Sequence, residues 1–215
     1  MSFLDVTIEL LIACGYTLGI FAITCVCAIP LGLVFCFLSK SRFKVVRIIM
    51  RVLIWIIRGT PLMLQIIVVF YVPGLVFQIP MRNRMFAVCI AFVINYAAYF
   101  SEIFRGGIES IPVGQYEACS VLGLTKAQTF FKVILPQVIK RIVPPMSNEI
   151  ITLVKDTSLA NIIGIGEIIL TAKEIVSVHA LIWPLFYTAV FYLVMCGVLT
   201  IVFRKIEKKL DYYKG

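Results

Sequence analysis

The stretch IELLIACGYTLGIFAITCVCAIPLGLVFCFL, residues 8–38, contains a single charged side chain, Glu9. A helix needs about 20 mostly apolar residues to cross a bilayer, so this stretch is long enough to span one. Its extra length predicts a tilt, or a kink at Pro30. No lysine or arginine precedes it, which argues against a cleaved signal peptide. We therefore expect the first membrane span to be retained.

The whole chain has the composition of a membrane protein: 61% of its 215 residues are hydrophobic, 14% are charged, and the mean hydropathy is +1.04. A soluble domain with this composition would expose large apolar surfaces to water. We predict an all-α, polytopic fold over residues 1–215, a single transmembrane domain. Its five predicted spans cover about 8–38, 61–79, 84–104, 138–170 (interrupted early by Pro144-Pro145) and 182–203.

Between the first two spans, the stretch KVVRIIMRVLIWIIR (44–58) combines apolar residues with four regularly spaced cations. Steps of three, four and seven residues return to the same helical face, so the cations form one stripe. We expect a basic helix in the membrane interface that is broken by Gly59-Thr60-Pro61. The cations on the stripe are Lys44, Arg47, Arg51 and Arg58.

Lysine and arginine are distributed unevenly among the predicted loops, and cytoplasmic loops are the ones that collect them. Residues 39–58 hold six, residues 105–141 hold five, and the segment after 203 holds five, Lys214 among them. The predicted opposite side holds three: Arg82, Arg84 and Lys173. The distribution predicts an external N-terminus and a cytoplasmic C-terminus. The net charge of +9 is then a topology signal and not a nucleic-acid footprint.

The seven cysteines lie mostly in apolar runs and include no C-x-x-C pair, so we interpret them as small apolar side chains. The single histidine, His179, has no ligand partners nearby in sequence, and we expect it in a loop. We predict no metal site.

The segment 115–136, here called the insert, is less apolar and falls on the predicted cytoplasmic side. We expect one short helix from Gln115, with Glu117 near its positive end, that stops at Gly123. A second helix is expected from Thr125, an N-cap with Gln128 three residues later, to Leu135-Pro136. Such a compact pair of helices suits docking to a soluble partner. The alternative is an ordinary ordered loop, which would show the same sequence pattern.

The insert resembles the motif that marks membrane subunits of ATP-binding-cassette (ABC) importers: Glu-Ala-Ala, Gly, then Ile-x-Leu-Pro. The chain reads Glu117-Ala118-Cys119, Gly123 and Val133-Ile134-Leu135-Pro136 at the same spacing, with Cys119 and Val133 as the two departures. Three further stretches are similar to the polar amino acid branch, whose members import histidine, lysine, arginine, glutamine or cystine. They are IRGTPLMLQ (57–65), NYAAYFSEIFRGGIESIPVGQYEA (95–118) and NEIITLVKDTSL (148–159).

The resemblance implies the type I ABC importer permease architecture, in a multi-pass protein of the bacterial cell membrane. It implies a second permease subunit, identical or homologous, an external amino acid binding protein, and a cytoplasmic ATPase dimer that binds ATP and Mg. The insert would be the coupling helix region, with Glu117, Ala118, Gly123, Leu135 and Pro136 as coupling residues. The chain has no G-x-x-x-x-G-K-[ST] motif, so we expect no enzyme activity in this subunit.

Ionisable residues within predicted spans are costly and are usually functional or paired. Glu149 and Asp156 lie seven residues apart, on one helical stripe with Thr152 between them. They would line a substrate cavity and accept the ammonium group of an amino acid. The alternative is structural, with the acids paired to Lys155 or Arg105.

Three further polar residues are candidates for the same cavity: Gln65, Asn95 and Arg105. The guanidinium of Arg105 suits a substrate carboxylate, but Glu102 lies three residues before it and would form an intrahelical pair. Tyr96 and Tyr99 are expected to serve in packing or at an interface.

These observations favour a permease subunit of an ATP-driven importer, with the cargo open among basic amino acids, glutamine and cystine. The alternative is an ion-coupled secondary amino acid transporter that uses Glu149 and Asp156 as its own coupling site. A membrane anchor that recruits a soluble protein through the insert is a third hypothesis, against which the intramembrane acids argue.

Overall fold

The computed structural model describes residues 2–210, and this part of the chain contains helices and no β-strand. Lys214, counted above among the C-terminal cations, lies outside the described residues. The elements are α1 (Phe3–Ser39), α2 (Lys44–Gly59), α3 (Leu62–Phe77), α4 (Arg84–Glu109), α5 (Val113–Val121), α6 (Lys126–Gln128), the π-helix η1 (Thr129–Ile134), α7 (Leu135–Asp156), the 3₁₀-helix η2 (Thr157–Ile163), α8 (Ile168–His179) and α9 (Trp183–Leu210).

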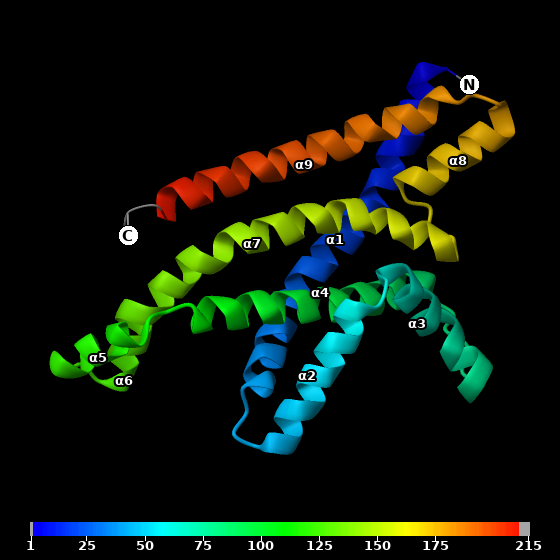
Figure 1. Ribbon diagram of the computed structural model, residues 1–215. Coiled ribbons are helices and arrows are strands. Elements are labelled where there is room, and N and C mark those ends of the chain that lie inside the picture. The colour runs from blue at the N-terminus through cyan, green and yellow to red at the C-terminus, as the bar shows by residue number, and fades with distance from the viewer. Residues whose placement is uncertain (1, 211–215) are drawn as a thin grey trace.

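Helix α4 occupies the middle of the molecule, where α1 crosses it and α7 packs along it (Figure 1). The insert, formed by α5, α6 and η1 with the first turn of α7, lies at one end of α4 and α7. Helices α3 and α8 lie toward the other end, and α9 runs beside α7 in the opposite direction (Figure 1). This arrangement leaves most of α9 on the outside.

Helix α1 begins at a capping box, in which the side chains of Ser2 and Asp5 satisfy each other's backbone N–H groups. Its buried side chains recur every three or four residues, which places them on one face. At Gly32 that face meets α4 so closely that an added Cβ would lie 2.9 Å from Cβ of Phe100 and 3.0 Å from the carbonyl oxygen of Ala97. The closest approach of the two helices therefore requires glycine.

Among residues 2–210, three helices are long and apolar enough to cross a membrane: α1, α4 and α9. A fourth candidate is the pair α2 and α3, which is bent by 107° at the short break around Thr60. The predicted ranges 8–38, 84–104 and 182–203 lie along these three helices. Helix α1 starts earlier than its range, at Phe3, and α4 and α9 end later, at Glu109 and Leu210. The count of five spans stays a prediction.

The predicted fourth span, 138–170, is not a single helix. Helix α7 ends at Asp156, the chain continues as the 3₁₀-helix η2, and α8 begins at Ile168. The interruption expected at Pro144-Pro145 does not occur, because α7 continues through both prolines. A proline removes one backbone donor but still has a helical φ, and packing against α4 and α9 supports this segment.

The second helix of the insert also differs from the prediction, since it does not end at Leu135-Pro136. The chain passes from α6 through the π-helix η1 directly into α7, whose first turn contains Pro136. The N–H of Leu135 donates to the carbonyl of Phe130, five residues earlier, as a π-helical turn requires. Proline is tolerated in the first turn of a helix, so the insert and α7 form one uninterrupted helical path.

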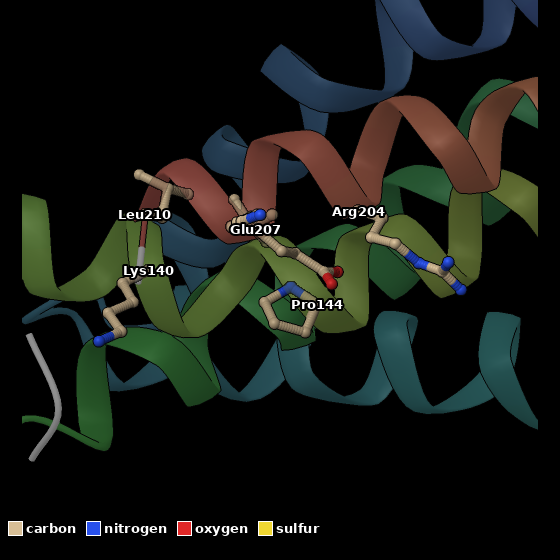
Figure 2. Close-up of a pocket in the computed structure, with 7 residues that line it drawn as sticks. Lys140, Pro144, Arg204, Glu207 and Leu210 are labelled. Atoms are coloured by element: carbon tan, nitrogen blue, oxygen red, sulfur yellow. The ribbon is translucent and has the colours of Figure 1, made fainter. Parts of the chain in front are cut away.

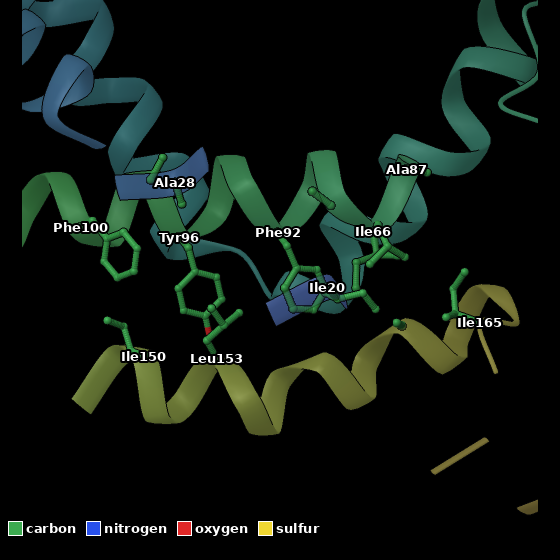
Figure 3. Close-up of a cluster of buried hydrophobic side chains, with 14 of the residues drawn as sticks. Ile20, Ala28, Ile66, Ala87, Phe92, Tyr96, Phe100, Ile150, Leu153 and Ile165 are labelled. Atoms are coloured by element: carbon green, nitrogen blue, oxygen red, sulfur yellow. The ribbon is translucent and has the colours of Figure 1, made fainter. Parts of the chain in front are cut away.

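The main core lies between α1, α4 and α7, and aromatic rings of α4 fill it. Phe92, Tyr96 and Phe100 are all buried, and Figure 3 shows Phe100 and Tyr96 directed toward Ile150 and Leu153 of α7 and Phe92 beside Ile20 of α1. The seven cysteines are free thiols. His179, predicted in a loop, is the last residue of α8 and is exposed.

Candidate functional site

Glu149 and Asp156 lie on α7, and both are half-buried. The hydroxyl of Tyr96, on α4, donates a hydrogen bond of 2.7 Å to Oδ2 of Asp156. Tyr96 is only 2% exposed, so its ring is fixed by the core and its hydroxyl holds the carboxylate in place. Thr152, also half-buried, lies one helical turn from each acid. The predicted stripe is therefore present, with Tyr96 as an additional member.

The ion pairs considered as the alternative for these acids are not found among residues 2–210. The four ion pairs in this part of the chain include neither Glu149 nor Asp156. Lys155 is exposed and points away from the stripe. No cation of the described chain neutralises either acid at contact distance, so both remain available for a cationic group of a ligand.

Arg105 is engaged elsewhere. Its guanidinium donates to both oxygens of Glu102, at 3.1 and 2.5 Å, and to Glu109 at 2.8 Å. Arg58 and Lys40 extend this network, each 3.5 Å from one of the two carboxylates. Arg105 lies nine residues beyond Tyr96 on α4, about 14 Å along the helix axis. The structure therefore places it in an ionic network that joins α1, α2 and α4, apart from the cluster at Asp156.

Gln65 and Asn95 meet each other, away from Asp156, at the break between α2 and α3. The amide nitrogen of Gln65 donates to the carbonyl of Ile57 at 2.7 Å and to the hydroxyl of Thr60 at 3.0 Å. Its oxygen accepts a hydrogen bond of 3.0 Å from the amide of Asn95, which is buried. These bonds satisfy carbonyls that the end of α2 leaves without helical partners, so the pair braces the 107° bend.

Glu167 is a functional-site candidate that the sequence analysis did not single out, although it lies within the predicted span 138–170. It is fully buried and caps α8, accepting from the backbone N–H groups of Ile169 and Leu170 at 2.9 and 2.8 Å. The hydroxyl of Tyr192, on α9, donates to it at 3.1 Å. Its charge inside an apolar run was the available signal. Because its acceptors are used, it serves to fix α8 against α9.

The first helix of the insert, α5, starts at Val113 with Pro112 as its N-cap, two residues earlier than predicted. Gly123 follows it with a φ of +68°, the left-handed conformation expected at that position. Thr125 and Gln128 form the predicted capping box at the start of α6. A Cβ added at Gly123 would meet no atom within 4 Å, so the backbone conformation is what restricts this position.

The base of the insert is tied to the helices that flank it. The side chain of Gln137 donates to the side chain of Gln115 at 3.1 Å, and Arg141 donates to the carbonyl of Ser110. A small buried cluster joins the end of α4 to η1 and α7 through Ile111, Ile134 and Val138. Movement of the insert is thereby linked to both helices.

The tip of the insert carries a different kind of surface. Val121, Leu122 and Phe131 are 88%, 76% and 65% exposed, and Phe130 is exposed beside them. Large apolar side chains gathered at a loop tip indicate a protein contact when they lie outside the membrane. The predicted coupling residues Glu117, Ala118 and Gly123 are exposed in the same region, whereas Leu135 and Pro136 are half-buried at its base.

Residues 28–212 match the family described as "Binding-protein-dependent transport system inner membrane component". Two curated relatives come from Bacillus subtilis (strain 168). The L-cystine transport system permease protein TcyB is 37% identical over 92% of this chain and 85% of its own length. The arginine transport system permease protein ArtQ is 34% identical over 90% of this chain and 89% of its own length.

A solved structure titled "Crystal structure of an amino acid ABC transporter with histidines" has the same fold, with a TM-score of 0.88. The two chains are 29% identical, and the similarity covers 97% of this chain and 99% of the other. The aligned part of the two chains is therefore nearly the whole of each. The predicted ion-coupled alternative finds no support in the family or in these relatives.

Proposed function

The chain belongs to the family of inner membrane components of binding-protein-dependent transport systems, and we propose that it is a permease subunit that imports polar amino acids. Its relatives are named as cystine and arginine permeases, and its helical fold is that of a solved amino acid ABC transporter. Cystine and arginine have different side chains but share the ammonium and carboxylate groups of every amino acid. We assign recognition of the ammonium group to Asp156 and Glu149, which form no ion pair within residues 2–210.

One observation carries this proposal: a continuous helical path joins the exposed tip of the insert to the acid stripe. It runs from Lys126 through the π-helix and α7 to Asp156 without a break. Helix α7 alone has 22 residues and is about 33 Å long. A displacement imposed on the insert therefore reaches the acids through one rod, which also packs against α4 and α9.

The working complex contains partners that this chain does not supply. We propose a second permease subunit, identical or homologous, so that the two acid stripes face a shared path. We also propose a cytoplasmic ATPase dimer that binds ATP and Mg and contacts the insert, and an external binding protein that delivers the amino acid. ATP changes the transport cycle only if its binding favours one conformation of the complex over another.

The orientation of the chain in the membrane is part of the proposal, with the N-terminus outside and the C-terminus in the cytoplasm. The three predicted cytoplasmic segments meet at one end of the fold. Lys40 lies 3.5 Å from Glu109, and Lys140 lines the same pocket as Arg204 and Lys208. Their clustering at one end supports the charge distribution as a topology signal.

The decisive experiment is reconstitution of the chain in liposomes with its ATPase and binding protein. Uptake of radiolabelled arginine, cystine and glutamine is measured with ATP or ADP inside. We expect accumulation of at least one of them with ATP only. Full-rate uptake with ADP contradicts the proposal, and collapse of uptake by an uncoupler at constant ATP restores the ion-coupled alternative.

Crosslinking tests the role of the insert separately. A photoreactive amino acid at Leu122 should crosslink to the ATPase in the assembled complex. The matched control is the same amino acid at Val178, which is 75% exposed near the other end of the fold. Crosslinks to the ATPase from position 178, or none from position 122, would remove the insert from the coupling mechanism.

A further inference from the structure

A pocket lies between α7 and the C-terminal end of α9, with a volume of about 390 Å³. Figure 2 shows Arg204 and Glu207 extending from α9 toward the part of α7 that contains Pro144, with Lys140 and Leu210 also at the pocket. Lys208 and Val143 complete its lining. The pocket thus combines cationic side chains with an apolar wall.

The pocket lies at the level where a membrane meets water. Helix α9 contains no charged residue from Trp183 to Phe203, a run of 21 residues. At a rise of 1.5 Å per residue this run is about 31 Å long, which equals the hydrocarbon thickness of a bilayer. Arg204 is the first residue beyond the run. Its guanidinium is therefore placed at the depth of lipid headgroups.

The charge of the pocket is positive. Arg204 and Lys208 are four residues apart on one face of α9, and both are exposed. Neither takes part in an ion pair within residues 2–210. Glu207, the acid among the described residues that line the pocket, accepts a hydrogen bond of 3.1 Å from the hydroxyl of Ser147. Two cations of α9 without an ion pair in the described part of the chain favour an anionic ligand.

The surface above these cations is apolar and open. Val190, Val194 and Ile201 lie on nearly the same face of α9 as Arg204, at spacings of 14, 10 and 3 residues. They are 49%, 59% and 58% exposed. Only 6% of the apolar window of α9 is buried in the fold. An acyl chain would lie along this stripe while its headgroup occupies the pocket.

The pocket is separate from the acid stripe. At 100° per residue, Lys140 and Glu149 lie on opposite faces of α7, about 180° apart. Ser147, which contacts α9, is about 160° from Glu149. A ligand at the pocket would therefore contact the back of α7 and not the side that bears Asp156.

We propose that this pocket binds the phosphate headgroup of an anionic phospholipid, with Arg204 and Lys208 as its main contacts. Clusters of lysine and arginine beside a membrane span attract anionic lipids, and basic pockets between helices bind their headgroups. The bound lipid would hold the end of α9 against α7. This proposal rests on the membrane location of the chain and is independent of which solute the protein transports.

The test is native mass spectrometry of the full chain, purified in detergent with phosphatidylglycerol. The pocket variant is Arg204→Gln with Lys208→Gln. The matched control is Lys205→Gln with Lys209→Gln, which removes the same charge from exposed neighbours on the same helix that do not line the pocket. We expect the pocket variant to bind phosphatidylglycerol about tenfold to thirtyfold more weakly than the control, since each cation near a membrane surface contributes a factor of about five.

Equal retention of phosphatidylglycerol by the two double variants would overturn the proposal, as would equal retention of phosphatidylcholine and phosphatidylglycerol by the unmodified chain. Inorganic phosphate and glycerol phosphate form a further arm. If either displaces phosphatidylglycerol at micromolar concentration, the site is one for a free phosphate and the lipid assignment is wrong.

A second measurement uses the unmodified chain and therefore does not depend on how the variants fold. Phosphatidylglycerol with a photoreactive headgroup is incorporated in nanodiscs, and the crosslinked peptides are identified. We expect the crosslinks to concentrate on residues 201–210 and 140–144. An even distribution over the basic segments 39–58, 105–141 and 204–210 would contradict a specific pocket.

Discussion

The two ends of α7 are held in place by different kinds of contact, local at one end and long-range at the other. At the Leu135 end, the insert owes its shape to neighbours in sequence: the capping box at Thr125 and the left-handed turn at Gly123. At the Asp156 end, the carboxylate is held by Tyr96, which lies 60 residues earlier in the chain. One candidate site is thus set by local backbone rules and the other by packing between helices.

The difference also determines what a substitution costs. The hydrogen bonds of the insert are exposed, and water replaces a lost partner there at little cost. The bond between Tyr96 and Asp156 is partly buried, and a polar group left without a partner there costs about 1–3 kcal/mol. We therefore expect substitutions in the insert to act on coupling, and substitutions near Asp156 to act on both transport and stability.

The largest effect is expected at the acid stripe. Asp156→Asn keeps an acceptor for the hydroxyl of Tyr96 but removes the negative charge. Uptake should fall about 10- to 100-fold, since hydrogen bonds to charged groups contribute about 1.5–3 kcal/mol. The measurement is ATP-driven uptake per assembled complex, with the exposed Glu174→Gln as the control. Normal uptake per complex with poor assembly would show that Asp156 is structural.

The next largest effect is expected in the insert, where the structure depends on the local turn at Gly123. Gly123→Val places a β-branched residue at positive φ, which costs about 1–3 kcal/mol, whereas Gly123→Asn tolerates that conformation. We expect the valine variant to lose about five- to thirtyfold of its uptake, while ATP hydrolysis continues, and the asparagine variant to remain close to normal. Equal losses in both variants would mean that the side chain, and not the backbone turn, disturbs docking.

A smaller effect is expected from the contact between helices that holds Asp156. Tyr96→Phe removes the hydroxyl that donates to Asp156 but keeps the buried ring. We expect a loss of about 1–3 kcal/mol, which lowers the Tm by about 2–10 °C in a chain of this size. Tyr99→Phe on the same helix is the control, because no hydrogen bond of its hydroxyl is found in residues 2–210. The Tm values of the two variants are measured by thermal unfolding in the same detergent. Equal shifts in Tm would contradict a stabilising hydrogen bond from Tyr96 to Asp156.

The smallest effect concerns the brace at the bend between α2 and α3. Gln65→Leu and Asn95→Leu each remove one side of their hydrogen bond, and the double variant completes a thermodynamic cycle. We expect a coupling free energy of about 1 kcal/mol, typical of one neutral hydrogen bond. Strictly additive changes in stability would show that the two amides act independently and that the bend is held by apolar packing.

Several features could be predicted because their causes lie within a few residues. The apolar run 8–38, the break at Gly59-Thr60-Pro61 and the cap at Thr125 were all located correctly. Each depends on a helical length, a missing backbone donor or a local side-chain bond. The composition of the chain also excluded a soluble fold before any contact was known.

Other features failed because a long-range contact outweighed a local rule. Pro136 and Pro144-Pro145 indicated helix breaks, yet η1 and the packing of α7 against α4 and α9 keep the path continuous. Conversely, the predicted span 138–170 contains the end of α7, the turn of η2 and the buried Glu167 that caps α8. Hydropathy is averaged over many residues, so it does not show where one helix ends and a capping residue such as Glu167 starts the next.

The sequence by itself determined that this is a helical membrane protein with its cations gathered in three segments and an amphipathic insert, because apolar length, charge and caps act locally. Only the tertiary structure decided which polar groups meet. It joined Gln65 to Asn95, brought Arg58 and Lys40 to the carboxylates that the sequence already placed beside Arg105, and paired Asp156 with Tyr96. The physical reason is that a polar group in an apolar interior must find a partner, and helix packing selects which one lies within reach.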